Sequence, residues 1–403
     1  MNTTNFMGTK MESLASTSSP GGSIRTGQSR ASDARLAVQE FHARVHQPDT
    51  AFVIFFCSSH YDLDALADEM NRLFSGIRVV GCTTAGEIGP GGYCDFSLAG
   101  ASFSATDFAV DTGLFEKIQQ FDIARGQAFT HALLQQVEAK APSCNDKNSF
   151  AFLLIDGLSM REEPVVRTIQ AGLGNIPLVG GSAGDDLKFV RTWIFHDGAF
   201  HSDCAMLLLA TTPLPFKVFK TQHFASDSER LVVTEADPAL RLVKEINGLP
   251  AAEEYARIIG STLEGLNAER FANAPVVVVI DGTDYVRAIQ KANADGSLTF
   301  FCAIEEGLVL RVAHGVALMD NLLQAFDALR AQIGPLQAVL ACDCILRNLE
   351  ITHNDLKERV SAVFRENNAV GFSTYGEQYG GVHVNQTLTG IAFGNRPVDK
   401  SDA

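Results

Sequence analysis

The sequence has few of the features that mark membrane, nucleic-acid-binding or nucleotide-binding proteins. No uninterrupted apolar run reaches the roughly 20 residues that a membrane helix needs. Lys and Arg number 32 against 47 Asp and Glu, and the resulting net charge of −15 argues against a polyanion as the main partner. Neither a Gly-x-Gly-x-x-Gly motif nor a Gly-Lys-Ser/Thr phosphate loop occurs. We therefore expect no membrane and no nucleic acid among the partners.

The sequence also offers little for a secreted or metal-stabilised protein. The first ten residues lack the basic start and apolar core of a secretory signal, so the expected location is the cytoplasm. The eight cysteines lie mainly within apolar runs, which favours buried, reduced thiols over a disulfide framework. Cys342 and Cys344 alone do not supply the four ligands of a structural zinc site, and a redox-responsive thiol stays open as an alternative.

One short pattern occurs three times along the chain. Residues 81–87 read GCTTAGE, residues 180–185 read GGSAGD, and residues 371–377 read GFSTYGE. Each copy, here called a Gly-acid turn, follows a hydrophobic strand and a helix-like stretch. Its glycines allow close approach of the backbone, and its Ser, Thr and acidic residues supply hydrogen-bonding groups. A unit repeated in this way predicts duplicated architecture.

The order of the predicted elements indicates an α/β protein. We expect two related domains with mixed β-sheets flanked by helices, built from repeated strand–helix–strand–Gly-acid-turn units. Asp197-Gly198 between two apolar runs predicts a hairpin, so the strands cannot all be parallel. Around Asn247-Gly248 the pattern predicts helices over residues 238–246 and 251–258. The predicted boundaries are a flexible tail over residues 1–30, domains over 31–225 and 226–396, and a tail over 397–403.

Three segments resemble one protein family. Residues 81–88, GCTTAGEI, resemble the hallmark of the FIST N-terminal domain. Residues 371–377, followed by HVNQT at 383–387, look like the end of the FIST C-terminal domain, and ACDCILR at 341–347 sits where that family carries a cysteine-and-arginine segment. The resemblance spans roughly residues 35–395. It identifies the first predicted domain as FIST N-like and the second as FIST C-like.

The resemblance implies a sensory function rather than an enzymatic one. FIST proteins are sensory modules that bind small ligands and signal to kinases or cyclic-nucleotide enzymes. Without a fused output domain, this chain resembles the NosP group of haem-binding nitric-oxide sensors. That group works with a hybrid histidine kinase and so influences cyclic-di-GMP and biofilm formation. The implied cofactor is b-type haem, the implied gas ligand is nitric oxide, and a homodimer is compatible with the sequence. The alternative is a FIST sensor for a small metabolite such as an amino acid, without haem.

Haem would require an axial ligand, and histidine is the first residue type to consider. If the Asp-Gly pair forms a two-residue turn, His196 and His201 lie on one face of the hairpin and Phe195 and Phe200 on the other. We therefore name His201, and after it His196, as candidate ligands of the haem iron. The alternative is an exposed hairpin tip that merely tolerates histidine.

A ligand site is also expected near the Gly-acid turns. Their carboxylates could cap a pocket for an amine-bearing ligand, or could accept backbone hydrogen bonds that pin the turns. No nucleophile–base pair accompanies them, so catalysis is not expected. The residues predicted to bind ligand are His383, Glu87, Glu377, Arg347, Thr84, Thr374 and Asn385.

Overall fold

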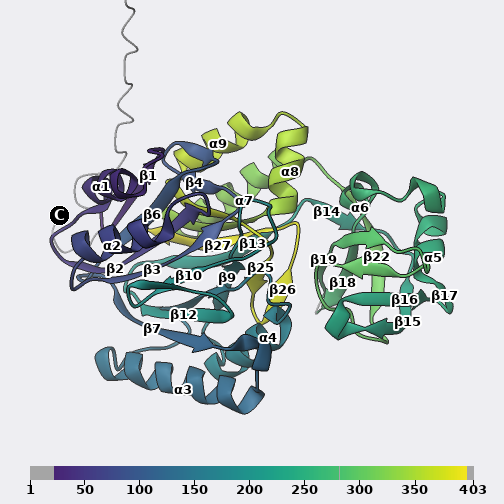
Figure 1. Cartoon of the computed structure of the whole chain (residues 1–403), viewed down its shortest axis with the longest axis horizontal. Helices are drawn as coiled ribbons and strands as arrows, with labels where there is room; N and C mark the ends of the chain where they lie inside the picture. Colours follow the sequence, from purple (N-terminus) through teal and green to yellow (C-terminus); the bar gives the residue numbers. More distant parts are fainter. Residues whose placement is uncertain (1–21, 281, 397–403) are drawn as a thin grey trace, which may run out of the picture.

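The chain forms two bodies of unequal size (Figure 1). The computed structural model describes residues 22–280 and 282–396. We call the larger body the three-repeat domain (residues 22–221 and 317–396) and the smaller one the inserted domain (residues 222–316). The predicted α/β class, with mixed sheets flanked by helices in two domains, is confirmed, but the two domains are not related copies, because the repeated units all lie in the larger body. No helix within the described ranges has both the length and the apolar character needed to cross a membrane.

The first repeat forms an open sheet with helices on one side. Asp33 and Asp62 precede its two helices, and each side chain accepts an amide of the first turn, which fixes the helix start. Its elements are β1 (Ile24–Ser29), α1 (Ala34–Val45), β2 (Thr50–Ser58), α2 (Leu63–Leu73), β3 (Arg78–Thr84), β4 (Glu87–Gly89), β5 (Gly92–Cys94) and β6 (Leu98–Ser104).

The second repeat follows the same order of elements. Asp122 caps its first helix in the same way, and Asp197 and Gly198 both have positive φ, as a two-residue hairpin turn requires. Its elements are β7 (Ala109–Glu116), η1 (Ile118–Gln120), α3 (Ile123–Lys140), β8 (Ser149–Ile155), α4 (Glu162–Leu173), β9 (Leu178–Ser182), β10 (Ile194–His196), β11 (Ala199–His201) and β12 (Cys204–Thr211).

The third repeat is interrupted after its first strand by the inserted domain. Its elements are β13 (Phe216–Thr221), α7 (Leu318–Ile333), β23 (Leu336–Cys344), α8 (Ile345–His353), α9 (Lys357–Glu366), β24 (Ala369–Thr374), β25 (Glu377–Tyr379), β26 (Val382–Val384) and β27 (Leu388–Gly394). The three Gly-acid turns therefore occupy corresponding places, after the third main strand of each repeat. The described chain thus contains three copies of one unit, all within the three-repeat domain.

The repeats exchange their short hairpins in a ring. The strand orders are β1-β6-β2-β3-β10-β11, β26-β25-β9-β8-β12-β7 and β13-β27-β23-β24-β4-β5. The hairpin of each repeat thus completes the sheet of another: first to third, second to first, and third to second. In each sheet one pair is parallel (β2 with β3, β8 with β9, β23 with β24) and the other pairs are antiparallel. The exchange brings the ends of β3, β9 and β24, and with them the Gly-acid turns, to one place.

A shared core holds the three sheets together. Apolar side chains from all three sheets, among them Phe56, Leu154 and Phe372, pack into one buried cluster, and Phe56 stacks on Phe372 at a ring-centroid distance of 4.6 Å. Separate clusters fill the space between each sheet and its own helices. Each sheet is therefore covered on both faces, which explains the near-continuous apolar runs in its central strands.

Two glycines of the repeated pattern are required by close strand packing. A Cβ atom added at Gly371 would lie 1.8 Å from the carbonyl oxygen of Ala341, and one added at Gly180 would lie 2.0 Å from that of Leu153. Both contacts are to the parallel neighbour within the same sheet. The repeated glycines thus serve backbone packing at these positions.

The inserted domain is mainly β-sheet, and Figure 1 shows it as a separate lobe beside the ends of β25 and β26. Nine strands form its sheet, covered by α5 and α6 over a core of its own. Its elements are β14 (Phe224–Ser226), β15 (Leu231–Asp237), η2 (Pro238–Leu240), β16 (Leu242–Ile246), β17 (Leu249–Pro250), α5 (Ala251–Ile258), η3 (Leu263–Gly265), α6 (Ala268–Asn273), β18 (Val276–Ile280), β19 (Thr283–Arg287), β20 (Ile289–Ala292), β21 (Leu298–Phe300) and β22 (Val309–Gly315).

Two local predictions differ from the structure. Residues 24–29, assigned to the tail over 1–30, form β1, which pairs with β6 along its whole length; residues 1–21 and 397–403 of the predicted tails lie outside the described residues. The predicted helix over residues 238–246 is wrong, because only 238–240 form a short helical turn and β16 follows. Val243 and Ile246 both face the core of the inserted domain, and a spacing of three suits a helix as well as a bent strand.

Candidate ligand-binding site

The three Gly-acid turns are hydrogen-bonded to one another through their backbones. The amide of Ala85 donates to Ser373 (3.0 Å), that of Gly184 to Thr83 (2.9 Å), and that of Ser182 to Gly376 (2.8 Å). Each bond joins two different repeats. The turns therefore form a single buried junction at which all three repeats meet.

In the first and third repeats the acid of the turn pins the chain before the last strand. Glu87 accepts from the amide (2.9 Å) and hydroxyl (2.7 Å) of Ser97, and Glu377 accepts from the amide (3.2 Å) and hydroxyl (2.6 Å) of Thr387. Burial raises the pKa of Glu87 to about 8 and raises that of Glu377 well above its usual range, although these hydrogen bonds oppose the shift. These hydrogen bonds are the ones expected if the acids hold the turns in place by accepting from backbone amides.

In the second repeat two aspartates take the place of the single acid: one accepts the amide before the last strand, and the other is the acid of the turn. Asp156 accepts from the amide of Asp203 (2.7 Å), the residue that precedes β12 as Ser97 precedes β6. Asp185, the acid of the second turn, instead accepts from the amides of residues 189, 190 and 191 at 2.8, 2.7 and 2.9 Å and from the hydroxyl of Tyr375. It therefore holds together an extra loop, residues 186–193, that has no counterpart before the hairpins of the other two repeats.

This extra loop is strained and presents apolar side chains. Asp186, Leu187 and Phe189 all have positive φ, between 52° and 62°, a region that residues with a Cβ rarely adopt. Leu187, Phe189 and Val190 are exposed, and the Phe189 ring stacks on Tyr375 at 4.7 Å with an interplanar angle of 18°. The hydrogen bonds to Asp185 thus maintain a conformation that places a phenylalanine beside the junction of the three turns.

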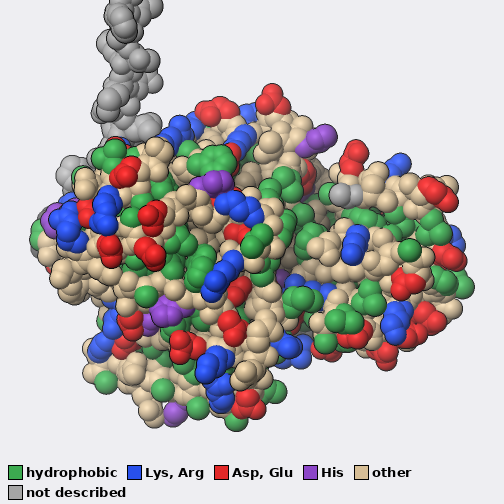
Figure 2. Space-filling model, viewed as in Figure 1, with side chains coloured by type: hydrophobic (Ala, Val, Ile, Leu, Met, Phe, Trp, Pro, Cys, Tyr) green, Lys and Arg blue, Asp and Glu red, His purple; other side chains and the backbone are tan. Residues whose placement is uncertain are grey.

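A cavity of about 500 Å³ lies between this loop and the inserted domain. On the side of the three-repeat domain it is lined by Gly157, Leu158, Met160, Glu162, Leu187, Phe189, Ile345, Leu346, Leu349, Tyr375 and Gln386. On the side of the inserted domain it is lined by Leu240, Arg241, Phe271, Ala272, Ala288, Ile289, Gln290, Thr299, Phe300 and Phe301. In Figure 2 a furrow separates the two bodies on the face shown. The volume of the cavity and its mainly apolar wall are typical of a small-molecule site.

Arg241 connects the inserted domain to the three-repeat domain beside the cavity. One of its terminal nitrogens lies 2.6 Å from Glu162 and 3.3 Å from Glu163, both on α4, and the other donates to the carbonyl oxygen of Phe301 (2.6 Å). Glu162 is buried, and this burial raises its pKa to about 7 even though the charge of Arg241 opposes the shift. The ion pair is thus a buried contact between two domains.

Three further hydrogen bonds join the domains around the same cavity. The amide of Ala303 donates to Glu163 (2.7 Å), Arg287 donates to the carbonyl oxygen of His383 (2.8 Å), and the Gln386 side chain donates to the carbonyl oxygen of Ala272 (3.1 Å). Two of these three hydrogen bonds have one charged partner, Glu163 or Arg287, and the third joins two neutral groups. The interface beside the cavity is therefore polar.

The third hairpin contributes a group of buried polar atoms without partners. They are Oε1 of Glu377, Oε1 of Gln378, Nε2 of His383, both amide atoms of Asn385, and Oε1 of Gln386. A Cβ at Gly376 would lie 2.8 Å from Nε2 of His383 and 3.2 Å from Nδ2 of Asn385, so these two side chains converge on that glycine. Burial lowers the pKa of His383 to about 4, and the imidazole is therefore neutral at pH 7. Buried orphan atoms in such number mark this hairpin as a place where water or ligand atoms are expected.

Arg347 lies in a different buried network. Its Nε donates to Asp343 (2.7 Å), which also bonds to the Tyr93 hydroxyl, and its Nη1 lies 3.1 Å from Nδ1 of His223. The other imidazole nitrogen of His223 lies 2.9 Å from Glu350. Because His223 begins the inserted domain and its carbonyl oxygen accepts from the amide of Val316 (2.7 Å), the network anchors both connections to that domain.

The predicted hairpin carries His196 and His201 as expected. Ile194 pairs with His201 and His196 with Ala199, so the two histidines share one face. Nε2 of His196 lies 3.1 Å from the Thr112 hydroxyl, and Nε2 of His201 lies 3.2 Å from the carbonyl oxygen of His196. Burial lowers the pKa of His196.

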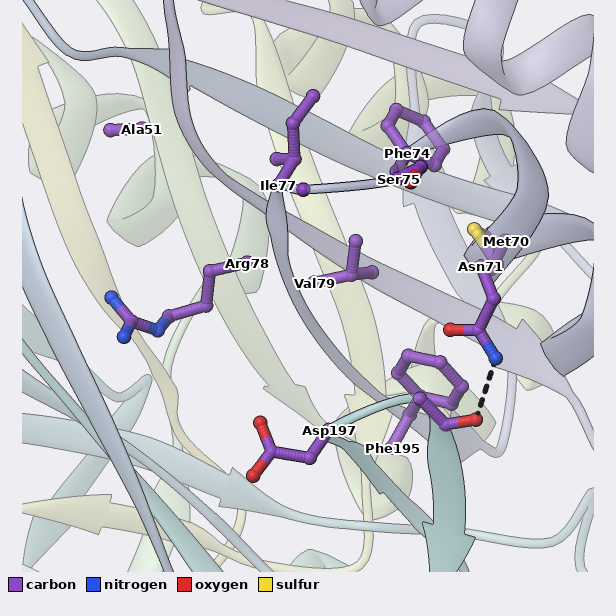
Figure 3. A pocket seen from close by; sticks show the side chains of 12 residues that line it. Ala51, Met70, Asn71, Phe74, Ser75, Ile77, Arg78, Val79, Phe195 and Asp197 are labelled. Carbon is purple, nitrogen blue, oxygen red and sulfur yellow. Dashed lines mark hydrogen bonds between the residues drawn. The ribbon is translucent and has the colours of Figure 1, made fainter.

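The pocket beside this hairpin lies on its other face. Figure 3 shows it between α2, β3 and the hairpin, with Phe195 pointing into it and Asn71 donating to the carbonyl oxygen of Gly198. Neither histidine lines this pocket or the cavity between the domains. A haem requires an apolar slot on the side of its axial imidazole. Neither of these two cavities therefore offers such a slot beside His196 or His201.

The other predicted ligand-binding residues divide into two groups, and none of them lines the cavity. Thr84 donates to Glu87 (2.5 Å). Thr374 donates to the carbonyl oxygens of Ser182 (2.8 Å) and Gly376 (2.7 Å), and His383 and Asn385 lie beside the same Gly376. The cavity is lined by their immediate neighbours in sequence: Tyr375, Leu346 and Gln386. The predicted residues are thus sequence neighbours of cavity-lining residues, and they do not line the cavity themselves.

The main cavity residues missed by the sequence analysis are Phe189 and Arg241. A signal for Phe189 was present, because the second copy of the pattern is followed by eight extra residues before its hairpin, and these include exposed apolar side chains. No comparable signal marked Arg241. Its partner acids lie nearly 80 residues earlier, and only the folded chain brings them together.

Comparison with known proteins agrees with the repeated motifs. The FIST N domain matches residues 51–249 and the FIST C domain matches residues 251–380. The chain therefore belongs to the family of proteins that carry these two domains, which indicates a sensory, ligand-binding module.

More distant likenesses add little. An uncharacterised protein of Methanocaldococcus jannaschii is 22% identical over 214 residues, which make up 48% of this chain and 38% of that protein. Two solved structures of cyanuric acid hydrolase, one of them from A. caulinodans, each cover 92% of this chain and 99% of their own. Their TM-scores are 0.36 and 0.35 at 7% and 9% identity. Scores at this level support no functional comparison.

Proposed function

We propose that this FIST protein is a sensor that binds a small molecule in the cavity between its two domains. The observation that carries the proposal is the cavity itself: about 500 Å³, with walls from both domains and a strained loop at its edge. Strained backbone persists where the surrounding structure enforces it, and it is common at ligand clamps. A ligand in this position would contact the inserted domain and the junction of all three repeats at once.

The signal would be the position of the inserted domain relative to the three-repeat domain. A ligand shifts a conformational equilibrium only through different affinities for the two states. A molecule that touches Phe189 on one side and Phe301 on the other gains both sets of contacts only when the domains are docked. The connections at His223 and Val316 lie together at the base of the inserted domain, so rotation there would open the cavity.

The proposal is tested by identifying what the purified protein retains. We would extract small molecules from the wild type and from Ala272→Trp, which places an indole in the cavity wall, and compare them by mass spectrometry. Ala328→Trp on the exposed side of α7 is the matched control. We expect a compound that the wild type and the control retain and Ala272→Trp loses. Equal retention by all three proteins, or no compound together with unchanged hydrogen exchange in Ala272→Trp, would reject the cavity as the sensory site.

The haem and nitric-oxide function implied by the family resemblance is a separate candidate, as is its hybrid histidine kinase partner. It rests on the resemblance, because the hairpin geometry gives no support to His201 or His196 as axial ligands. An absorption spectrum after addition of haemin tests it. A Soret band that shifts with nitric oxide and is lost in His201→Ala, but kept in His42→Ala, would establish it. A spectrum that equals free haemin at stoichiometric haem would exclude it.

A further inference from the structure

We propose that the cavity between the domains takes a neutral, mainly apolar molecule with an aromatic ring, rather than an amino acid or another charged metabolite. This inference rests on the proposed function of the same cavity and specifies its class of ligand. It depends on three properties of the wall: its charges, its aromatic surface and its polar groups.

The wall offers no free charge to a ligand. Among the described residues that line the cavity, only Glu162 and Arg241 are charged, and they are bonded to each other at 2.6 Å. The same terminal nitrogen of Arg241 also contacts Glu163 and the other one donates to the carbonyl oxygen of Phe301, while Nε is buried without a partner. A ligand carboxylate or ammonium would therefore lose its hydration without gaining a partner ion, or would have to break a buried pair. A zwitterionic amino acid would face this penalty twice.

The aromatic wall is arranged to accept a flat ring. Phe189 and Tyr375 stack nearly parallel at 4.7 Å, and Phe271, Phe300 and Phe301 approach from the inserted domain. Stacked and edge-to-face ring pairs gain energy beyond the burial of apolar area. A ligand ring that adds to the Phe189–Tyr375 pair is thus favoured over a saturated chain of the same volume.

The polar groups of the wall are neutral and few. Among the described residues, the uncharged polar side chains that line the cavity are Gln290, Thr299, Gln386 and Tyr375, and the Tyr375 hydroxyl already donates to Asp185. The side-chain oxygen of Gln386 is buried without a partner, while its nitrogen is occupied by the carbonyl oxygen of Ala272. This oxygen is a buried acceptor that no donor of the protein satisfies. A neutral ligand with one N–H or O–H donor would complete the hydrogen bonding of the wall.

Two fluorescent probes with the same carbon skeleton test the inference. N-phenyl-1-naphthylamine is neutral, aromatic and carries one N–H donor, whereas 8-anilinonaphthalene-1-sulfonate differs from it by one sulfonate. Both would be titrated into the full-length wild type, Ala272→Trp and Ala328→Trp. We expect the neutral probe to bind the wild type at least about tenfold more tightly than the sulfonate, because the sulfonate would be buried without a counter-ion. We expect Ala272→Trp, but not Ala328→Trp, to remove the tight binding.

A second pair of variants keeps the test independent of the indole. Phe189 and Phe96 are both about half exposed (53% and 58%), and both have positive φ (52° and 55°), but only Phe189 lines the cavity. Phe189→Ala should weaken the neutral probe about three- to tenfold, as expected for loss of one stacked ring, and Phe96→Ala should not.

The outcomes separate the two proposals. If neither Ala272→Trp nor Phe189→Ala weakens the binding of either probe, the cavity is not a binding site and the proposed function fails. If both variants weaken binding but the sulfonate binds as tightly as the neutral amine, the cavity is a site and the inferred class of ligand is wrong. Tight, variant-sensitive binding of the neutral probe alone supports both.

Discussion

The buried ion pair between the domains makes a quantitative prediction for Arg241→Met. The substitution keeps an unbranched apolar stem and removes the charge that partners Glu162. Glu162 has an ordinary pKa of 4.5 in the unfolded chain, and in the folded protein it is buried at the start of α4 with a pKa raised to about 7. Without Arg241 the carboxyl group can stay buried only when it is protonated.

The cost of that protonation follows from the pH. The value of pH 7 lies 2.5 units above the ordinary carboxyl pKa of 4.5. At about 1.4 kcal/mol per unit, keeping the carboxyl group protonated at pH 7 costs about 3 kcal/mol. At pH 5 the same calculation gives a protonation cost of under about 1 kcal/mol. The wild type, in which the pKa of Glu162 is already about 7, carries most of the same cost at pH 7. We therefore expect docking of the inserted domain to weaken between pH 5 and pH 7 in both proteins, and Arg241→Met to add a further loss of under about 1 kcal/mol at pH 7. The sign is fixed, because a raised carboxyl pKa favours the folded state at low pH and loses that advantage as the pH rises.

Hydrogen exchange provides the assay, because one amide reports on the interface directly. The amide of Ala303, in the inserted domain, donates to Glu163 of the three-repeat domain. Its protection, corrected for the intrinsic rate at each pH, gives the free energy of opening at this contact. Lys244→Met is the control, since Lys244 pairs with Glu235 on the exposed surface of the same domain, and little change is expected.

The double variant Arg241→Met/Glu162→Gln decides between this reasoning and simple loss of packing. Glutamine is neutral at every pH, so protection of Ala303 at pH 7 should rise above that of the single variant, and the pH dependence of the single variant should disappear. Equal protection of Ala303 in Arg241→Met at pH 5 and pH 7, or no recovery in the double variant, would refute the electrostatic account.

Three further substitutions test the repeats and their turns. Gly371→Ala should lower the free energy of unfolding, measured by urea denaturation, by about 3 kcal/mol or more, because the new Cβ would meet a carbonyl oxygen of the neighbouring strand. Gly76→Ala is the control: this glycine has open space around it and a positive φ, so the substitution should cost only about 1 kcal/mol. Asp185→Ala should cost the loop over residues 189–191 about 3 kcal/mol of local stability, seen as faster exchange of those amides; unchanged exchange would contradict its role in holding the loop. Glu87→Gln should become more stable relative to the wild type as the pH rises from 4.5 to 8, because the raised pKa of Glu87 makes the wild type lose stability across that range; parallel pH profiles would show that the carboxyl is not buried as described.

The repeated pattern was visible in the sequence for a physical reason. A parallel strand pair as close as β23 and β24 leaves no room for a Cβ at Gly371, and the acid that follows must be near enough to accept the amide before the next strand. The glycine requirement recurs in all three copies, and the acid has this role in the first and third, whereas in the second the acid of the turn holds the extra loop. The hairpin at Asp197-Gly198 was predictable on the same basis, since two consecutive residues with positive φ restrict the choice of amino acids.

The site was only partly predictable. Strand alternation determines which neighbours share a face, but it does not tell which face will meet a second domain. Thr374 and Asn385 were selected from the motif, yet their neighbours Tyr375 and Gln386 line the cavity. The helix predicted over residues 238–246 failed for a related reason: apolar residues three apart fit a helix until the sheet of the inserted domain supplies a different partner.

By itself, the sequence determined the α/β class, the three related turns and the membership of a sensory family, because these depend on short stretches whose backbone demands particular residues. The tertiary structure alone decided that each repeat gives its hairpin to another, that Arg241 reaches two glutamates nearly 80 residues away, and that an apolar cavity lies between the domains. Those features arise from contacts between distant segments, and no local pattern of residues encodes where two surfaces will meet.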